Sequence, residues 1–341
     1  MDMKKYIGKR VFWGVVALFG LSIFIFYLAR ILPGDPVLMM VDPRTPQPVI
    51  DDLRSRLALD KPIYVQYFYW LKDVLSGNFG YSFYSRHSLT IDIRKYLPQS
   101  LELIALAGLI QIGGAFFIGI SAGSNINKWQ DHVARSFAYI GCSIPAFVWA
   151  IFLQLIFAYW LGLFPISGAL SEGYVAPSGP TGFISIDSLL HGEVGTFVNF
   201  LQHLILPAFA LAILGMAQAA RILRTGMNRI KEKEYISMAH AYGFPIRTIR
   251  YKYLLRPSII PAVTVMGMQI AIMLGNAFLV EMVFRYPGFS KFAINAMLQN
   301  DLNTIVATVV IIGFLFFVIN LIVDVIVAYI DPRIRYGEDG G

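Results

Sequence analysis

The sequence predicts an all-helical, polytopic membrane protein with six transmembrane helices and both chain ends in the cytoplasm. Of its 341 residues, 57% are hydrophobic and only 14% are charged, and a soluble fold could not bury so much apolar surface. The apolar residues also form long blocks without Asp, Glu, Lys or Arg, as bilayer-spanning helices do. The expected spans lie within residues 11–29, 103–127, 136–171, 194–220, 257–280 and 302–323.

Two of these blocks need interpretation. The block 136–171 is too long for one helix, and we expect Pro165 and Gly168 to end its span. The block 11–29 follows the basic segment 1–10, as in a signal peptide. It is nevertheless long enough to cross the bilayer, and no small-residue cleavage site follows it, so we expect a retained signal-anchor helix.

The distribution of Lys and Arg sets the expected orientation. The long loop 31–98 is placed outside although it carries eight basic residues, because long loops cross the membrane largely regardless of charge. The loop 172–193 contains three acidic residues and no Lys or Arg, and we expect a surface lid or docking loop there. The segments placed inside hold 17 of the 28 basic residues, and they are 1–10, 128–135, 221–256 and 331–341.

This topology predicts three regions. The anchor helix and an outer loop region occupy residues 1–97, a transmembrane domain of five helices occupies 98–328, and a cytoplasmic tail occupies 329–341. The transmembrane domain includes the cytoplasmic loop 221–256.

The sequence argues against several classes of function. The net charge of +7 arises from basic residues beside apolar blocks, so membrane lipid rather than nucleic acid is the expected partner. A single cysteine and five scattered histidines form no metal-ligand pattern, and there is no Walker loop, His-Glu-x-x-His or Gly-x-Ser-x-Gly motif. We therefore expect no cofactor, no metal and no enzymatic activity. An intramembrane hydrolase would need catalytic groups at mid-span, and a channel or ion-coupled carrier would transport without an ATPase.

The most informative segment, 221–245, lies between the fourth and fifth expected spans and is the most basic stretch of the chain. It predicts a short amphipathic helix on the cytoplasmic side, ended by Gly243 and prevented from continuing by Pro245. This helix could bind a partner or rest on anionic lipid. The face expected from helical spacing consists of Tyr235, Met238, Ala239 and Tyr242.

This segment resembles a loop of the permease subunits of binding-protein-dependent ABC importers, in the dipeptide, oligopeptide and nickel permease family. That loop reads Glu-Ala-Ala, three residues, Gly and later Pro, and here Ser237-Met238-Ala239 and Gly243 occupy the two places. The peptide branch has Ala-Arg-Ala-Lys-Gly, and both of its basic positions are replaced in 239–243. The resemblance implies that the helix docks on an ATPase through Glu234, Tyr235, Ser237, Met238, Ala239, His240, Tyr242 and Gly243.

The resemblance extends over nearly the whole chain, and the segment 181–187 is similar to that of the dipeptide type. It implies a type I permease fold in the plasma or inner membrane that works by ATP-driven alternating access. The implied partners are a homologous second permease, cytoplasmic ATPase subunits and an extracytoplasmic substrate-binding protein. Relatives carry dipeptides, oligopeptides, nickel or oligosaccharides, so the substrate stays open. Tags that carry the resemblance include 31–36, 77–82, 143–147, 165–168, 286–288 and 331–333.

Polar residues in or near the spans are candidates for the substrate path. Ionisable groups are costly there and mark either a solute route or a contact between helices. Both alternatives stay open for Glu102 and Glu281, and Gln269 can also bond across helices. We take Glu102, Gln269 and Glu281 as the candidate path residues. The spacing of Gly119 and Gly123 favours close helix packing in the second span.

Overall fold

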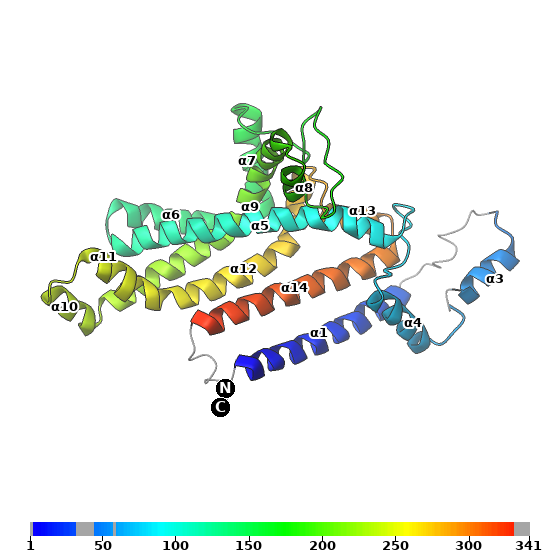
Figure 1. Cartoon of the computed structure of the whole chain (residues 1–341), viewed down its shortest axis with the longest axis horizontal. Coiled ribbons are helices and arrows are strands. Elements are labelled where there is room, and N and C mark those ends of the chain that lie inside the picture. Colours follow the sequence, from blue (N-terminus) through cyan, green and yellow to red (C-terminus); the bar gives the residue numbers. More distant parts are fainter. Residues whose placement is uncertain (1–2, 32–43, 57–58, 331–341) are drawn as a thin grey trace.

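The computed structural model describes residues 3–31, 44–56 and 59–330, and regular secondary structure in these ranges is entirely helical. Figure 1 shows long helices lying side by side, with shorter helices at both ends and on one flank. The elements are α1 (Met3–Ile31), α3 (Gln47–Arg56), α4 (Ile63–Leu75), α5 (Leu89–Ser124), α6 (Trp129–Ser143), α7 (Ala146–Leu153), the π-helix η1 (Gln154–Trp160), α8 (Ile184–Leu190), α9 (Val194–Lys231), α10 (Glu234–Ala241), α11 (Ile246–Thr248), the π-helix η2 (Ile249–Leu255), α12 (Arg256–Val283), α13 (Phe289–Leu298) and α14 (Leu302–Ile330).

Membrane-spanning helices account for most of the described chain. Five are long and apolar enough to cross a bilayer: α1, α5, α9, the continuous run from α11 to α12, and α14. A sixth span results if α6 and the α7–η1 run are counted together. The predicted fold class is confirmed. The regional boundary predicted at residues 97 and 98 falls inside α5.

The third block does not form one straight helix, because α6 and the α7–η1 run meet at a bend of 109°. Ile144 is extended at φ −105° and ψ 125°, as a residue before proline prefers to be. Pro145 then opens α7, where its missing N–H costs no helical hydrogen bond. The run ends at Trp160, before the expected stop at Pro165.

Glycines on α5 allow close contact with α9, as the small-residue spacing predicts. A Cβ atom on Gly119 would lie 2.9 Å from Leu223 Cδ2 and 3.1 Å from the Ala220 carbonyl oxygen. A Cβ atom on Gly123 would lie 2.8 Å from Met227 Sδ. Because the two helices approach so closely, α5 and α9 form the centre of the bundle, and α6, α7 and α12 pack around α9.

α1 and α14 form an antiparallel pair at the edge of the bundle (Figure 1). Leu21 of α1 packs over Gly313 of α14, and Arg10 forms an ion pair of 3.4 Å with Asp324. The first residues of α1 and the last residues of α14 therefore lie at the same end of the molecule, as the predicted topology requires. The expected tail 329–341 lies almost wholly outside the described residues.

The long loop between α1 and α5 contains two helices, α3 and α4, followed by an ordered turn at 77–82. Gly77 and Gly80 adopt φ values of 85° and 90°, which favour glycine. Ser82 Oγ donates a hydrogen bond of 2.7 Å to Asp301 Oδ2, just before α14. The turn thereby connects the loop to the last span. The tag 331–333, and the tag 31–36 beyond Ile31, lie outside the described residues.

Replacing Gly119 with leucine should separate α5 from α9 and destabilise the protein by about 1–3 kcal/mol, as overpacking does. Thermal unfolding of the purified chain in detergent measures the effect. Gly113→Leu is the matched control on the same helix, because nothing lies within 4 Å of a Cβ atom at Gly113. Equal unfolding midpoints for the two variants would contradict this account of the helix contact.

Candidate functional site

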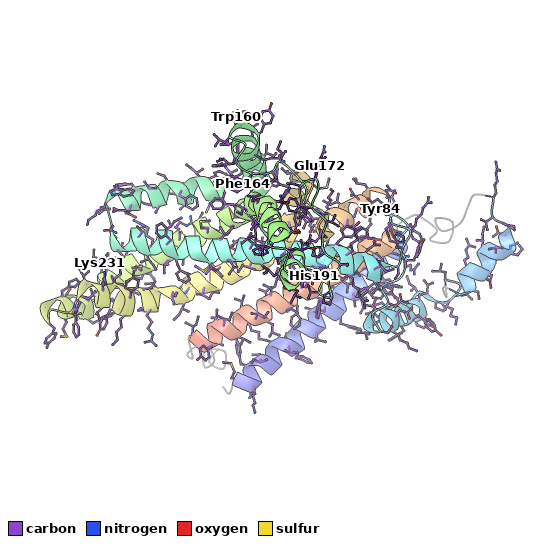
Figure 2. The ribbon with its side chains drawn as sticks, turned by 45° about the horizontal axis from the view of Figure 1, so that its top comes forward. Tyr84, Trp160, Phe164, Glu172, His191 and Lys231 are labelled. Atoms are coloured by element: carbon purple, nitrogen blue, oxygen red, sulfur yellow. The ribbon has the colours of Figure 1, made fainter. Side chains whose placement is uncertain are left out.

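The short helix α10 lies at the end of the molecule opposite α4 and α13, directly after the long helix α9 (Figure 1). α9 ends at Lys231, whose position is labelled in Figure 2. Lys233 is extended at φ −78° and ψ 140°, and it occupies the N-cap position without a side-chain cap. Glu234 then places a carboxylate in the first turn, where the helix dipole favours negative charge.

The C-terminus of α10 is closed by backbone hydrogen bonds. The Gly243 N–H donates to the His240 carbonyl at 3.0 Å, and the Phe244 N–H donates to the Ala239 carbonyl at 3.1 Å. These two hydrogen bonds form a Schellman motif, in which the residue that donates the first bond adopts a left-handed conformation. Gly243 supplies it with a φ of +73°. The predicted glycine stop is confirmed, and Pro245 occupies the N-cap position of α11.

The face predicted for α10 contains one residue, Ala239, that does not lie on the exposed side of the helix. Ala239 is only 5% exposed and, with Ile236, packs into an apolar cluster that includes Ile249 and Leu254 of η2. α10 is held against η2 and the end of α9, so its small residue contacts this chain. The prediction failed because helical spacing cannot tell which side of a short helix the rest of the chain will cover.

The opposite side of α10 and the turn after it remain uncovered. Met238 is 60% exposed and Tyr242 is 75% exposed. Ser237 and His240 are also exposed, and His240 Nδ1 lies 2.9 Å from the Ile236 carbonyl oxygen. Clustered exposed apolar and aromatic side chains indicate an interaction surface. We define the transverse surface as Tyr235, Met238, Tyr242, Phe244 and Ile246.

Glu102 holds the loop 172–193 against α5. Its carboxylate accepts hydrogen bonds from the Ile184 N–H at 3.2 Å and the Ser185 N–H at 2.8 Å, at the start of α8. Asp187 in turn accepts hydrogen bonds from residues 181 and 182. Figure 2 labels Glu172 and His191 near the two ends of this loop, which is folded onto the bundle.

Glu281 connects the end of α12 with α5 and α13. It is fully buried, and it accepts hydrogen bonds from Ser100 Oγ at 2.5 Å and from the Lys291 N–H at 2.9 Å. Nearby, the Tyr286 hydroxyl donates to the Gln99 carbonyl at 3.1 Å. Burial raises the pKa of Tyr286 well above its usual value. The partners of Glu102 and Glu281 favour the structural alternative for both carboxylates.

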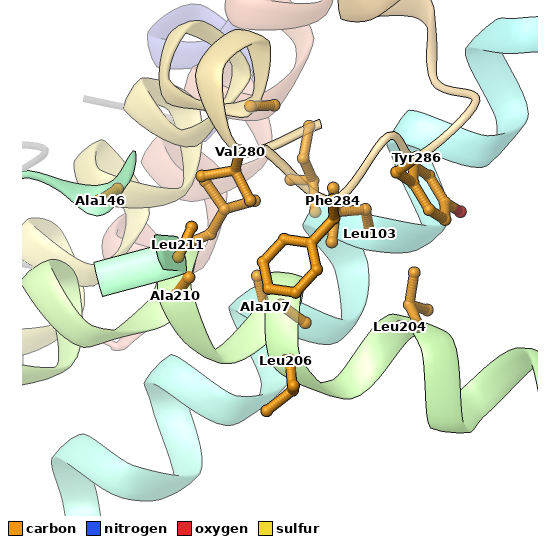
Figure 3. Packing of buried hydrophobic residues seen from close by; sticks show 14 of the residues in the cluster. Leu103, Ala107, Ala146, Leu204, Leu206, Ala210, Leu211, Val280, Phe284 and Tyr286 are labelled. Atoms are coloured by element: carbon orange, nitrogen blue, oxygen red, sulfur yellow. The ribbon is translucent and has the colours of Figure 1, made fainter. Parts of the chain in front are cut away.

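The turn that carries Tyr286 rests on the main apolar cluster. Figure 3 shows Phe284 beside Ala107 of α5 and Leu206 of α9, with Val280 of α12 close by. The Gly168 N–H also donates to the Phe284 carbonyl at 2.9 Å, which attaches the loop after η1 to the same turn. The tag 165–168 therefore contacts the turn that leads into the tag 286–288.

Gln269 belongs to a polar layer inside the bundle. Its Nε2 donates a hydrogen bond of 2.6 Å to Gln218 Oε1, which joins α12 to α9. Gln111 Nε2 donates to the Met266 carbonyl at 2.9 Å and joins α5 to α12. Gly215 leaves room between these amides, since a Cβ there would clash with Gln111 Oε1. The analysis of the sequence missed Gln111 and Gln218, although amides within apolar blocks are a usable signal.

A partly buried ion pair that the sequence did not indicate joins α6 to α9. Arg224 donates from Nε and Nη2 to the two carboxylate oxygens of Asp131, which is 0% exposed. The Asn127 N–H adds a hydrogen bond of 3.0 Å to Asp131 Oδ2. Two ionised groups are tolerated inside a bundle when they satisfy each other in this way. The pair fixes the end of α9 that leads into α10.

Comparison with known proteins gives a family for the whole chain. The family described as binding-protein-dependent transport system inner membrane component matches residues 115–336, and the N-terminal part of such membrane components matches residues 3–104. The chain belongs to this family. The resemblance stated above is confirmed, and the permease is a transport component of the inner membrane rather than an enzyme.

Similar proteins cover almost the entire permease. The probable D,D-dipeptide transport system permease protein of Escherichia coli (strain K12) is 33% identical over 96% of this chain and 96% of its own length. The di/tripeptide transport system permease protein of Pseudomonas aeruginosa (strain UCBPP-PA14) is 32% identical, with 98% and 99% covered. The oligopeptide transport system permease protein of Bacillus subtilis (strain 168) is 30% identical, with 98% and 100% covered.

Replacing Glu281 with alanine should destabilise the permease by about 1–3 kcal/mol, because the donors from Ser100 and Lys291 would lose their buried acceptor. Thermal unfolding in detergent measures this loss. The exposed Glu172, replaced in the same way, should leave the unfolding midpoint unchanged. An unchanged midpoint in Glu281→Ala, together with altered uptake, would instead assign this carboxylate to the substrate path.

Proposed function

We propose that this permease forms half of a translocation path for di- and oligopeptides and pairs with a homologous second permease. The observation that carries this proposal is the match over nearly the full length to permeases of dipeptide, di/tripeptide and oligopeptide transport systems. Nickel and oligosaccharides are the competing substrates. An exposed stripe on α12 supports a role for the second permease, because it offers apolar surface along the second half of this helix, at Met268, Ile272, Leu279 and Met282.

We further propose that the transverse surface docks on a cytoplasmic ATPase. The chain has no Walker loop of its own, so energy from ATP has to arrive through a protein contact. α10 suits this role because Ile236 and Ala239 attach it to η2 and α9, while Met238 and Tyr242 stay exposed. Movement of the ATPase would then pass through α10 into two spans. Such rigid-body coupling is a common basis for alternating access.

The remaining partner is an extracytoplasmic substrate-binding protein. The elements at the end of the molecule opposite α10, including α4 and α13, provide a folded surface for it (Figure 1). The loop 172–193 is a further candidate contact, because it is acidic and is held in place through Glu102. In this scheme the binding protein delivers solute on one side and the ATPases drive the two permeases from the other.

Replacing Tyr242 with glutamate should weaken ATPase binding by about 1–3 kcal/mol, because a charge would be buried in the contact. Retention of the ATPase on tagged permease and peptide-stimulated ATP hydrolysis in proteoliposomes measure the effect. The control is Tyr64→Glu on α4, where the side chain is 61% exposed at the other end of the molecule. If both variants retain ATPase like the parent, the helix is not the docking element and rests on lipid.

Reconstitution tests the transport scheme as a whole. Proteoliposomes with the permease, its second permease, the ATPases and the binding protein should accumulate a labelled dipeptide when ATP is supplied, and omission of any component should abolish uptake. Uptake by the permease alone would favour a channel or ion-coupled carrier. ATP-dependent uptake of nickel or an oligosaccharide, without uptake of the dipeptide, would reassign the substrate.

A further inference from the structure

A pocket of about 430 Å³ lies at the end of α1 opposite the transverse surface. Its walls come from α1, α4, the turn at 78–80 and the start of α14. Phe26 of α1 and Trp70 of α4 form part of the apolar wall, and the centres of their rings are 5.3 Å apart. The charged side chains that line the pocket are Arg30, Lys61 and Asp73. The pocket is distinct from the transverse surface and from the polar layer around Gln269.

The cations in this pocket are not neutralised by the part of the chain that the structure describes. The half-buried Arg30 places its guanidinium 5.2 Å from the centre of the Phe26 ring. Lys61 Nζ lies 5.2 Å from the centre of the Tyr69 ring. Within the described ranges, neither group lies within 4.0 Å of a carboxylate oxygen. Two cations that are held only over aromatic rings leave their hydrogen-bond donors available to an anion.

The same pocket also offers acceptors. Gln66 Nε2 donates to the Lys61 carbonyl at 2.8 Å, which orients the amide. The exposed carboxylate of Asp73 forms no ion pair among the described residues. The pocket therefore combines unused donors for an anion with unused acceptors for a cation, which suits a zwitterion.

The position of the pocket along α1 indicates where this zwitterion comes from. Arg10 pairs with Asp324 near one end of the α1–α14 pair. Arg30 follows twenty residues later, which corresponds to about 30 Å of helix and equals the usual hydrocarbon thickness. Arg30 thus lies at the depth of the opposite lipid headgroups. Trp70 and Tyr69 are residue types that collect at this depth.

We propose that the pocket binds the headgroup of a phospholipid that carries a phosphate and a primary ammonium, as phosphatidylethanolamine does. Arg30 and Lys61 donate hydrogen bonds to the phosphate oxygens. Asp73 accepts hydrogen bonds from the ammonium group. Phosphatidylcholine lacks ammonium N–H donors, and phosphatidylglycerol lacks the cation, so each satisfies only half of the pocket.

Native mass spectrometry of the full-length permease in detergent tests this site through the affinities of individual lipids. Phosphatidylethanolamine should bind about tenfold more tightly than phosphatidylcholine or phosphatidylglycerol, since each loses hydrogen bonds between charged groups. Arg30→Gln and Asp73→Asn should each weaken phosphatidylethanolamine binding by about tenfold. Arg30→Lys should weaken it less, because the positive charge remains.

The controls are Arg285→Gln and Asp60→Asn, which remove the same charges from exposed positions outside the pocket and should leave lipid binding unchanged. Unfolding midpoints without added lipid establish that the pocket variants are folded, and Asp73→Asn keeps the test valid if Arg30→Gln is unstable. Equal affinities for the three lipids, or unchanged binding in both pocket variants, would overturn the proposal. Binding of free glycylglycine without binding of phosphatidylethanolamine would overturn the lipid assignment.

Discussion

The close contact between α5 and α9 is the constraint on which the rest of the permease depends. Gly119 and Gly123 let the two helices approach, because a side chain at either position would strike Leu223 or Met227. Without water in the bilayer, such close van der Waals packing supplies much of the attraction between spans. α6, α7 and α12 pack against α9 in turn. A bundle arranged around one tight pair can present its other faces to lipid or to a second permease.

Buried carboxylates attach the loops and short helices to this pair. Glu102 fixes the start of α8, Glu281 joins α12 to α5 and α13, and Asp301 connects α14 with the turn at 77–82. Each carboxylate accepts hydrogen bonds from backbone N–H groups, hydroxyls or both. This arrangement satisfies the loop donors and the buried carboxylates at the same time, since neither could be left unpaired without a large cost. The end of the permease opposite α10 is therefore organised by acids that also resemble path residues in the sequence.

The short helix α10 packs on its own chain with one side and leaves the other side exposed. Ile236 and Ala239 secure α10 to its own chain, and Tyr235, Met238 and Tyr242 remain exposed. Arg224, paired with the buried Asp131, fixes the end of α9 just before this helix. A force applied to α10 would therefore reach α6 and α9 through packed and hydrogen-bonded groups. This rigidity supports the proposed coupling between ATPase movement and the rearrangement of the spans.

The sequence by itself determined the helical fold class, the approximate positions of the spans and the stop of α10. Apolar block length and the left-handed preference of Gly243 are local properties, so their effect does not depend on how the rest of the chain packs. The order of short motifs also pointed to the family. The tertiary structure decided that Pro145 bends the third span by 109° rather than merely starting a helix. Proline limits the local geometry, but packing of α6 and α7 against α9 sets their direction.

The tertiary structure also decided which polar residues meet. Ser100 and Glu281 are 181 positions apart in the chain, and Glu102 and Ser185 are 83 apart. No period or turn signal encodes such pairs, because they form only when three or more elements have packed. The same reason explains why Ala239 was assigned to the wrong side of α10 and why Gln111 and Gln218 were missed. Local patterns specify which helices form, and only their packing specifies which side chains become partners.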